Sequence, residues 1–315
     1  MRLPAFLIGL MTAICVSAAS AFAEELPPAS RKIVPPDDAW MEKVEKASPE
    51  KPTVAVTSPR KVLVFALHTA FDHKVIPHLN AALKILGDKS GAFEATISFD
   101  IEDLSAESLA KYDVLVLNNN CSAGPRRNLL LDELERNERY QNMDKMQRQA
   151  QAAELEKSML DFVASGKGLT VFHGAPVLLN NSEEFTEMVG CAFHYHPPTQ
   201  RVTLNVVEAD HPLLAAFRGK GPLVHTDEPY CFNGAYEKKD VRPLLAMDTT
   251  KLKGFKGTPG ETRYVCWIRP HGKGRVFYCS PSHYPETYES PTMLRFILDA
   301  MQYAAGDLKC EDAKP

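Results

Sequence analysis

The stretch GKGLTVFHGA, residues 166–175, decides the fold. Its first residues are typical of a helix end, Leu169–Phe172 is a short apolar strand, and His173 stands at the tip of a sharp Gly-containing turn. In open α/β sheets, ligands bind outside the carboxyl ends of the strands, and several hydrolase folds place their nucleophile at such a junction. Because this tip holds neither Cys nor Ser, the stretch predicts a ligand site without the usual nucleophile.

Strands and helices alternate before this stretch. Lys61–Leu67 and Asp113–Leu117 are continuous apolar runs, as expected of strands covered on both faces. Phe93–Phe99 alternates like a strand, and Val75–Leu86 has helical periodicity with Gly87 as the expected C-cap. This order predicts an α/β fold with a mostly parallel sheet and right-handed crossovers.

The second half of the chain mixes strands with loops. Arg201–Val207 alternates like a strand. Tyr264–Ile268 and Arg275–Cys279 are expected to pair as core strands around a turn at residues 271–274. Met293–Ala304 is predicted to be an amphipathic closing helix.

The N-terminus has the features of a signal peptide. Ala5–Val16 is an apolar run that is shorter than the roughly 20 residues of a membrane span, and Ala21-Phe22-Ala23 offers the small residues of a cleavage site. We therefore expect export to the periplasm or secretion. The expected division of the chain is a signal peptide (1–23), a Pro-rich leader (24–59) with a short helix at 38–47, one domain (60–306) and a tail (307–315).

The composition excludes several classes of partner. The formal net charge is −4, which favours neither nucleic acid nor an anionic membrane surface, and no segment after the signal peptide predicts a membrane span. None of the six cysteines after residue 23 forms a C-x-x-C pair, so a zinc ribbon is not expected. Export permits disulfides, whose pairing the spacing leaves open.

A helical insertion is predicted at residues 124–150. The surrounding region, Arg126–Ser165, is long and rich in Arg, Glu, Gln and Met, which suggests a helical hairpin that projects from the body. It is either a solvated surface or a docking site for a partner or a second copy of the chain. The positions expected to face inward are Leu134, Met143, Met146, Ala150, Leu155, Met159 and Phe162.

Three histidines are expected to meet at one edge of the sheet. His68 follows the first strand, His173 ends the strand after Gly168, and His283 follows the last strand. Three neutral imidazoles suffice to hold a catalytic divalent metal such as zinc with an open position. They could instead act as general acid and base, or be strand-end histidines with purely structural hydrogen bonds.

Carboxylates and further histidines could complete the site. Asp227 and Glu228 are expected in a loop, where one would face the site and act as a ligand or base beside His173. In an extended backbone His194 and His196 would share a face and line one wall for substrate. A sugar ring could stack on some of the aromatic side chains Tyr230, Phe232, Trp267, Tyr284 and Tyr288, although such residues also fill cores.

An ordered set of short motifs resembles the trehalose-utilisation (ThuA-like) family from about Lys61 to Ala305. The set comprises GLTVFHGA at 168–175, HPPTQ at 196–200, DHP at 210–212, TDEPY at 226–230, GRVFY at 274–278, and His283. The insertion and His194 depart from the family pattern.

This resemblance implies a flavodoxin-like three-layer sandwich similar to class I glutamine amidotransferases. His173 then falls at or next to their catalytic Cys, so glutamine hydrolysis is not expected. The positions that match the family are His68, His173, His196, Asp227, Glu228 and His283.

The resemblance also implies a role in sugar metabolism, including disaccharides oxidised at the 3-position. The leading hypothesis is an exported hydrolase, lyase or isomerase for a sugar or 3-keto-glycoside. The alternatives are a non-catalytic carbohydrate-binding or scaffold protein, and a cysteine hydrolase that uses Cys121 after the third strand.

Overall fold

Five of the nine strands of the central sheet are parallel. The computed structural model describes residues 34–315, so the expected signal peptide lies outside the described residues. The parallel strands are β1 (Arg60–Phe65), β2 (Phe93–Ser98), β3 (Val114–Asn118), β4 (Gly168–Phe172) and β11 (Gly274–Cys279). Their order, β2-β1-β3-β4-β11, is the flavodoxin-like order, which confirms the predicted fold class.

Antiparallel strands continue the sheet beyond β11 in the order β10-β9-β6-β7. They are β10 (Arg263–His271), β9 (Arg242–Met247), β6 (Gln200–Val206) and β7 (Leu223–Asp227). The predicted hairpin is confirmed, because β10 pairs with β11. A separate small sheet pairs β5 (Ala192–Tyr195) with β8 (Cys231–Asn233).

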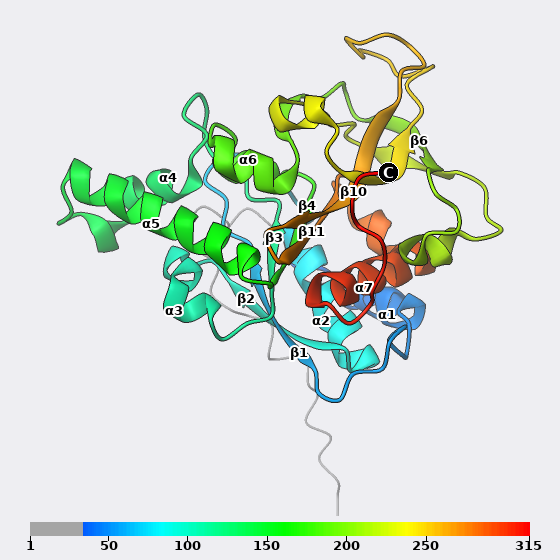
Figure 1. The fold of residues 1–315 in the computed structure, drawn as a ribbon, viewed down its shortest axis with the longest axis horizontal. Helices are drawn as coiled ribbons and strands as arrows, with labels where there is room; N and C mark the ends of the chain where they lie inside the picture. The colour runs from blue at the N-terminus through cyan, green and yellow to red at the C-terminus, as the bar shows by residue number, and fades with distance from the viewer. Residues whose placement is uncertain (1–33) are drawn as a thin grey trace, which may run out of the picture.

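Helices cover both faces of the sheet (Figure 1). One layer comprises α1 (Asp38–Ala47), α2 (Ile76–Ser90) and α7 (Pro291–Ala305), and the other α3 (Ala106–Leu109), α4 (Leu129–Arg136), α5 (Lys145–Ala164) and α6 (Glu183–Val189). Short 3-10 helices lie at Ile101–Leu104, Glu138–Tyr140, Ala175–Leu179, Pro212–Phe217, Gly234–Lys238 and Pro285–Glu289. Successive residues of a strand face opposite layers: Val62 and Val64 belong to the core under α2 and α7, and Leu63 and Phe65 to the core under α5.

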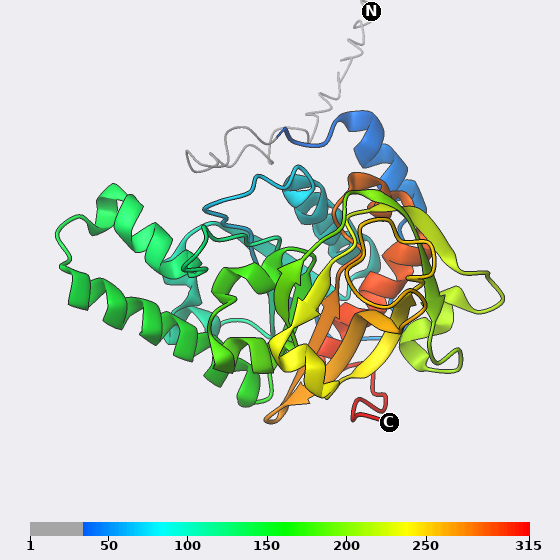
Figure 2. The same cartoon turned by 90° about the horizontal axis from the view of Figure 1, so that it is seen from above.

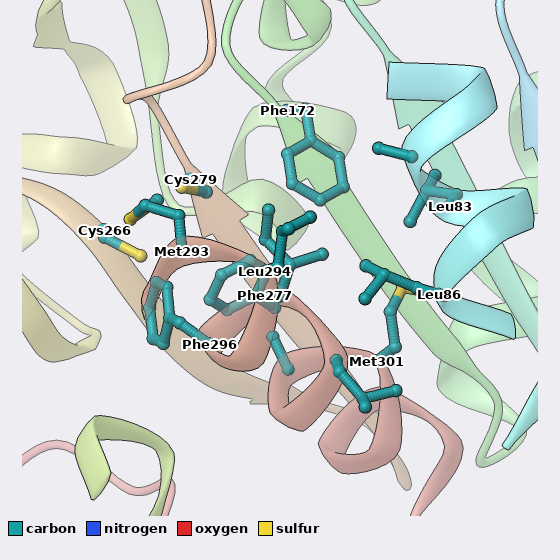
Figure 3. Close-up of a cluster of buried hydrophobic side chains, with 14 of the residues drawn as sticks. Leu83, Leu86, Phe172, Cys266, Phe277, Cys279, Met293, Leu294, Phe296 and Met301 are labelled. Carbon is teal, nitrogen blue, oxygen red and sulfur yellow. The ribbon is translucent and has the colours of Figure 1, made fainter. Parts of the chain in front are cut away.

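The core between α2, α7 and the sheet is drawn in Figure 3. Phe172 of β4 and Phe277 of β11 are fully buried there, beside Leu83 of α2 and Leu294 of α7. Burial of such side chains is worth about 1.5–3 kcal/mol each, so this core fixes where β4 and β11 end.

The predicted helix in the leader is confirmed as α1. Its N-cap Asp37 accepts a hydrogen bond from the Trp40 N–H at 2.8 Å, and Trp40 and Val44 are buried in the core. The chain then runs over α7, where the Val54 N–H donates to Oε1 of Gln302 at 3.0 Å. The described part of the leader therefore wraps against the domain.

Gly87 is not the C-cap that the sequence predicted. The helix α2 continues to Ser90, and Gly91, with φ of 67°, caps it. Gly87 lies where α2 crosses β2, since a Cβ there would stand 2.4 Å from the carbonyl oxygen of Phe93. The glycine serves close packing instead of a turn.

The insertion forms a hairpin of α4 and α5 that projects from the body (Figure 2). Leu134, Leu155, Met159 and Phe162 are buried, as predicted. Met146 and Ala150 are exposed, contrary to prediction, because they lie in the first turns of α5, which extend beyond the sheet (Figure 2).

Two further properties concern the described residues alone. Among residues 34–315, no helix combines the length and apolar character needed to cross a bilayer. The cysteines in this range are all free, and Cys310 alone among them is not fully buried.

We predict that Gly168→Ala destabilises the fold. A Cβ at Gly168 would stand 2.3 Å from the carbonyl oxygen of Ala304, a backbone atom of α7, and such overpacking costs roughly 1–3 kcal/mol. Thermal unfolding followed by circular dichroism should show Tm lowered by several degrees. Gly221→Ala is the matched control, since nothing lies within 4 Å of that Cβ. Equal Tm values for the two variants would contradict the prediction.

Candidate metal centre

Four side chains from separate loops meet at the carboxyl edge of the sheet. His73 follows β1, His173 follows β4, Glu228 follows β7 and His283 follows β11. One ligand atom from each lies within 4.8 Å of the others. We call these four residues the His/Glu cluster.

The turn at His173 has the sharp geometry that the sequence predicted. His173 has a positive φ of 41°, which is unfavourable for a residue with a Cβ and is held by its surroundings. Its backbone N–H donates to the carbonyl of Cys279 at 2.9 Å, and the Tyr278 hydroxyl donates to its carbonyl at 3.1 Å. Hydrogen bonds from β11 therefore fix the tip.

The tautomer of His173 follows from its partners. Nδ1 lies 2.8 Å from the Ser280 carbonyl, which can only accept, so Nδ1 carries the proton. Burial lowers the pKa of His173, which favours the neutral ring. Its Nε2 therefore directs a lone pair at Oε2 of Glu228, 3.3 Å away. Nδ1 of His283 lies 2.9 Å from the same Nε2 and 3.3 Å from Oε2 of Glu228, so either a proton on that nitrogen or a metal ion can occupy the space between these atoms.

The carboxyl group of Glu228 is surrounded by imidazoles. Oε2 lies 3.3 Å from Nδ1 of His283 as well as from His173, and Oε1 lies 3.2 Å from Nδ1 of His196. Burial acts to raise the pKa of Glu228, but the adjacent imidazoles of His173 and His283 outweigh it and lower the pKa. The group is therefore an anion that can compensate a positive charge in the cluster.

His73 has no hydrogen-bond partner. The residue is buried, and neither ring nitrogen has a partner within the described chain. Burial, and next the neighbouring His173 and His283, lower its pKa well below the usual value, so the ring is neutral. A buried polar group without a partner is costly. A bound ligand at one of the nitrogens would remove this cost.

Gly174 makes room for His73. A Cβ at Gly174 would lie 2.8 Å from Cε1 of His73 and 3.0 Å from Sγ of Cys121. The glycine after the histidine tip thus lets the loop after β1 approach the end of β4.

The His/Glu cluster fits a divalent metal ion. Metal bonds of about 2.0–2.2 Å place neighbouring ligand atoms about 3 Å apart, and the pairs among His173, His283 and Glu228 are separated by 2.9, 3.3 and 3.3 Å. Metal-binding histidines usually donate their other N–H to a carbonyl or carboxylate, as His173 does. Imidazole and carboxylate ligands suit zinc, iron or manganese.

The structure brings together His173, His283 and Glu228 but leaves His68 outside the cluster. His68 is buried and its Nε2 lies 3.0 Å from Oδ1 of Asp72. His73, five residues later, occupies the place expected of His68. The sequence stretch HTAFDH contains both histidines, and nothing in the spacing shows which one the loop turns toward the sheet edge.

Asp227 is the last residue of β7 and lies behind Glu228. As expected of adjacent residues, only Glu228 faces the cluster. The Oδ1 of Asp227 accepts the Glu228 N–H at 2.8 Å. Burial raises the pKa of Asp227 well above its usual value, against backbone hydrogen bonds from Glu228, His283 and Ser282. The geometry assigns Asp227 to holding the two loops together.

The expected substrate-binding residues divide into two groups. Tyr230 is buried, with its ring centroid 4.1 Å from that of His173, and Tyr284 lies 4.6 Å from His283. His196 contacts Glu228. His194 is exposed and packs on Tyr195 instead, because a register shift in β5 separates it from the face of His196.

The fold and this site define a class of protein: a flavodoxin-like α/β protein with a histidine-lined ligand site at the sheet edge. The structure is similar to a ThuA-like protein of Bacteroides uniformis (18% identity, TM-score 0.57, 80% of this chain and 94% of that one). It is also similar to a ThuA-like protein of Parabacteroides merdae (16%, 0.54, 79% and 90%).

The chain belongs to the ThuA family, described as trehalose utilisation, whose model matches residues 61–304. The match is consistent with a glutamine amidotransferase-like fold. Among curated proteins no sequence matches.

We predict one divalent metal ion per chain, bound through His73 and independent of His68. Isothermal titration with Zn²⁺ after chelator treatment should give a stoichiometry of one. His73→Ala should weaken binding by at least about tenfold because it removes a ligand. His68→Gln, a buried histidine of the same loop, is the matched control and should bind as the wild type does. The reverse order of affinities would contradict this ligand set.

We also predict that Cys121 is unreactive in the folded protein. Burial raises the pKa of its thiol to about 12, so almost no thiolate exists near neutral pH. Mass spectrometry after iodoacetamide treatment at pH 8 should show Cys121 unmodified until guanidinium unfolds the chain. Rapid labelling of the native protein would restore the cysteine-hydrolase alternative.

Proposed function

We propose that this chain is an exported, metal-dependent enzyme that acts on a neutral sugar or glycoside, including glycosides with a ketone at carbon 3. Family membership supports a carbohydrate substrate, and the signal-like segment 1–23 supports export. One arrangement carries the metal-dependent chemistry: Nε2 of His173, Nδ1 of His283 and Oε2 of Glu228 lie 2.9–3.3 Å from one another, beside the unpartnered ring of His73.

The four residues of the His/Glu cluster would hold the ion. A divalent metal at this place supplies a Lewis acid for a carbonyl or hydroxyl oxygen. The Glu228 carboxylate is paired with imidazoles rather than with arginine or lysine. Phosphate groups are typically recognised by arginine or lysine side chains. Because Glu228 and its neighbours include neither, the site favours an uncharged substrate.

His196 is the residue placed to move a proton. Its side chain is 40% exposed while its Nδ1 contacts Glu228 at 3.2 Å, and its ring stacks on Tyr230 at 5.9 Å. It is therefore open to substrate and held in orientation by two partners, as a general base requires.

A 3-keto-glycoside gives this arrangement a balanced reaction. His196 takes the proton from carbon 2, which the adjacent ketone makes acidic. The C2–H electron pair becomes the C1–C2 double bond as the C1–O bond breaks, and the departing alcohol takes the proton back. Water can then add across the double bond.

Turnover of 3-keto-trehalose by the metal-loaded protein tests this function. His173→Ala, Glu228→Gln and His196→Ala should each lower kcat/KM by about 10² or more, the usual worth of a proton-transfer group or an electrostatic contact. His194→Ala, two residues before His196 and outside the His/Glu cluster, should stay within twofold. Product is followed by chromatography or NMR.

Three outcomes would overturn the proposal. Full turnover by the double variant His173→Ala/His283→Ala would exclude the His/Glu cluster. Turnover unchanged by prolonged chelation would exclude the metal. Sugar binding with no product from any 3-keto-glycoside or unmodified disaccharide would favour the non-catalytic carbohydrate-binding alternative.

A further inference from the structure

We propose that Phe71 is an aromatic platform that holds the apolar face of a sugar ring against the His/Glu cluster, and that the helical insertion fixes this platform in place. The class of ligand rests on the proposed function above. The platform itself is inferred from the exposure, neighbours and anchoring of Phe71.

Phe71 is unusually exposed for its type. Its exposed fraction is 58%, and it is the aromatic member of the exposed large hydrophobic residues found within 34–315: Val34, Phe71, Met146, Val207 and Val224. Full burial of a phenylalanine is worth about 1.5–3 kcal/mol, and the fold forgoes much of this. Ligand sites typically combine aromatic side chains with a few convergent polar groups, and Phe71 stands beside such a group of polar side chains.

The ring of Phe71 borders the candidate metal ligands directly. Its centroid lies 4.7 Å from that of His73 at an interplanar angle of 69°, and 6.3 Å from that of His283 at 36°. Stacked rings are separated by roughly 4.5–7 Å between centroids. A ring stacked on the free face of Phe71 would therefore bring its substituents within reach of His73 and His283.

Strand ends hold the loop that carries Phe71. The backbone N–H groups of Thr69 and Ala70 both donate to the carbonyl of Cys121, at 2.9 and 3.1 Å. On the other side of Phe71, Asp72 pairs with the buried His68 at 3.0 Å. The loop is thus tied to the end of β3 and to its own strand.

The insertion adds further restraints on the same loop. Asp132 of α4 is buried, and its Oδ2 accepts from the Thr69 hydroxyl at 2.7 Å and from the Ala123 N–H at 2.9 Å. Arg136 of α4 donates to the Thr69 carbonyl at 2.7 Å. Because the loop that carries Phe71 is already ordered in the free protein, ligand binding costs less conformational entropy.

The chemistry of the platform indicates a cyclic ligand. A phenyl ring has no hydrogen-bonding group, so it cannot recognise the hydroxyl groups of a ligand by hydrogen bonds. It can only cover apolar surface, such as the C–H face of a pyranose, whose hydroxyls lie around the rim. Those hydroxyls would remain free to reach the His/Glu cluster, whereas an acyclic polyol offers no such face.

Isothermal titration of the metal-loaded protein with trehalose, methyl glucoside and sorbitol tests the platform. Phe71→Ala should raise Kd for the two cyclic probes at least tenfold, and Phe71→Trp should keep Kd within threefold. Met146→Ala, which removes an exposed apolar side chain elsewhere, should change nothing. Sorbitol should bind weakly to all variants.

Asp132→Asn tests the role of the insertion. It should weaken trehalose binding in the wild-type background and have no further effect in Phe71→Ala, because Asp132 acts through the loop. Additive effects of the two substitutions would refute this coupling.

Separate readouts distinguish the platform from the metal centre. Two measurements report on the metal centre alone: the Zn²⁺ stoichiometry, and the binding of acetohydroxamate, a small acyclic metal chelator. Both should be unchanged in Phe71→Ala. Unaltered binding of the cyclic probes by Phe71→Ala, or loss of Zn²⁺ from that variant, would overturn the platform. Wild-type protein that binds neither cyclic probe would also overturn it. Absence of Zn²⁺ binding by the wild type would instead refute the proposed function, and the sugar titrations can still be read without metal.

Discussion

The hydrogen bond from His173 Nδ1 to the Ser280 carbonyl is the constraint on which the site depends. Parallel pairing of β4 with β11 sets Phe172 opposite Cys279, so the segments that follow these two strands leave the sheet side by side. The bond fixes the imidazole as the tautomer with an unprotonated Nε2, and the positive φ of His173 directs that nitrogen toward Glu228. The core beneath β4 and β11 thereby determines the chemistry at their ends.

Apolar runs in the sequence predicted β1, β3 and β4, because strands that are covered on both faces are apolar throughout. Asp227 was expected in a loop but ends the strand β7, which the sequence did not reveal because it lies at the sheet edge and spans only Leu223–Asp227, where half-buried and exposed residues alternate before the buried Asp227. Gly87 suggested a helix end. The structure shows instead that a side chain at this position would clash with Phe93 of β2, a tertiary contact that the local sequence does not reveal.

The site was predicted as a meeting of strand-end histidines, and the choice between His68 and His73 lay beyond the sequence. Both follow β1, and only the tertiary contacts of the intervening loop decide which one faces β4. Those contacts come from Cys121 and from Asp132 in the insertion. The helical insertion, which the sequence suggested to be a surface feature, therefore contacts the loop that carries Phe71 and His73.

Anomalous diffraction from crystals grown with Zn²⁺, recorded on both sides of the zinc absorption edge, tests the central claim most directly. The account predicts one strong peak bounded by His73, His173, His283 and Glu228, with Nδ1 of His173 still hydrogen-bonded to the Ser280 carbonyl. A well-diffracting crystal with no peak there would contradict it, as would a peak on His68 and Asp72.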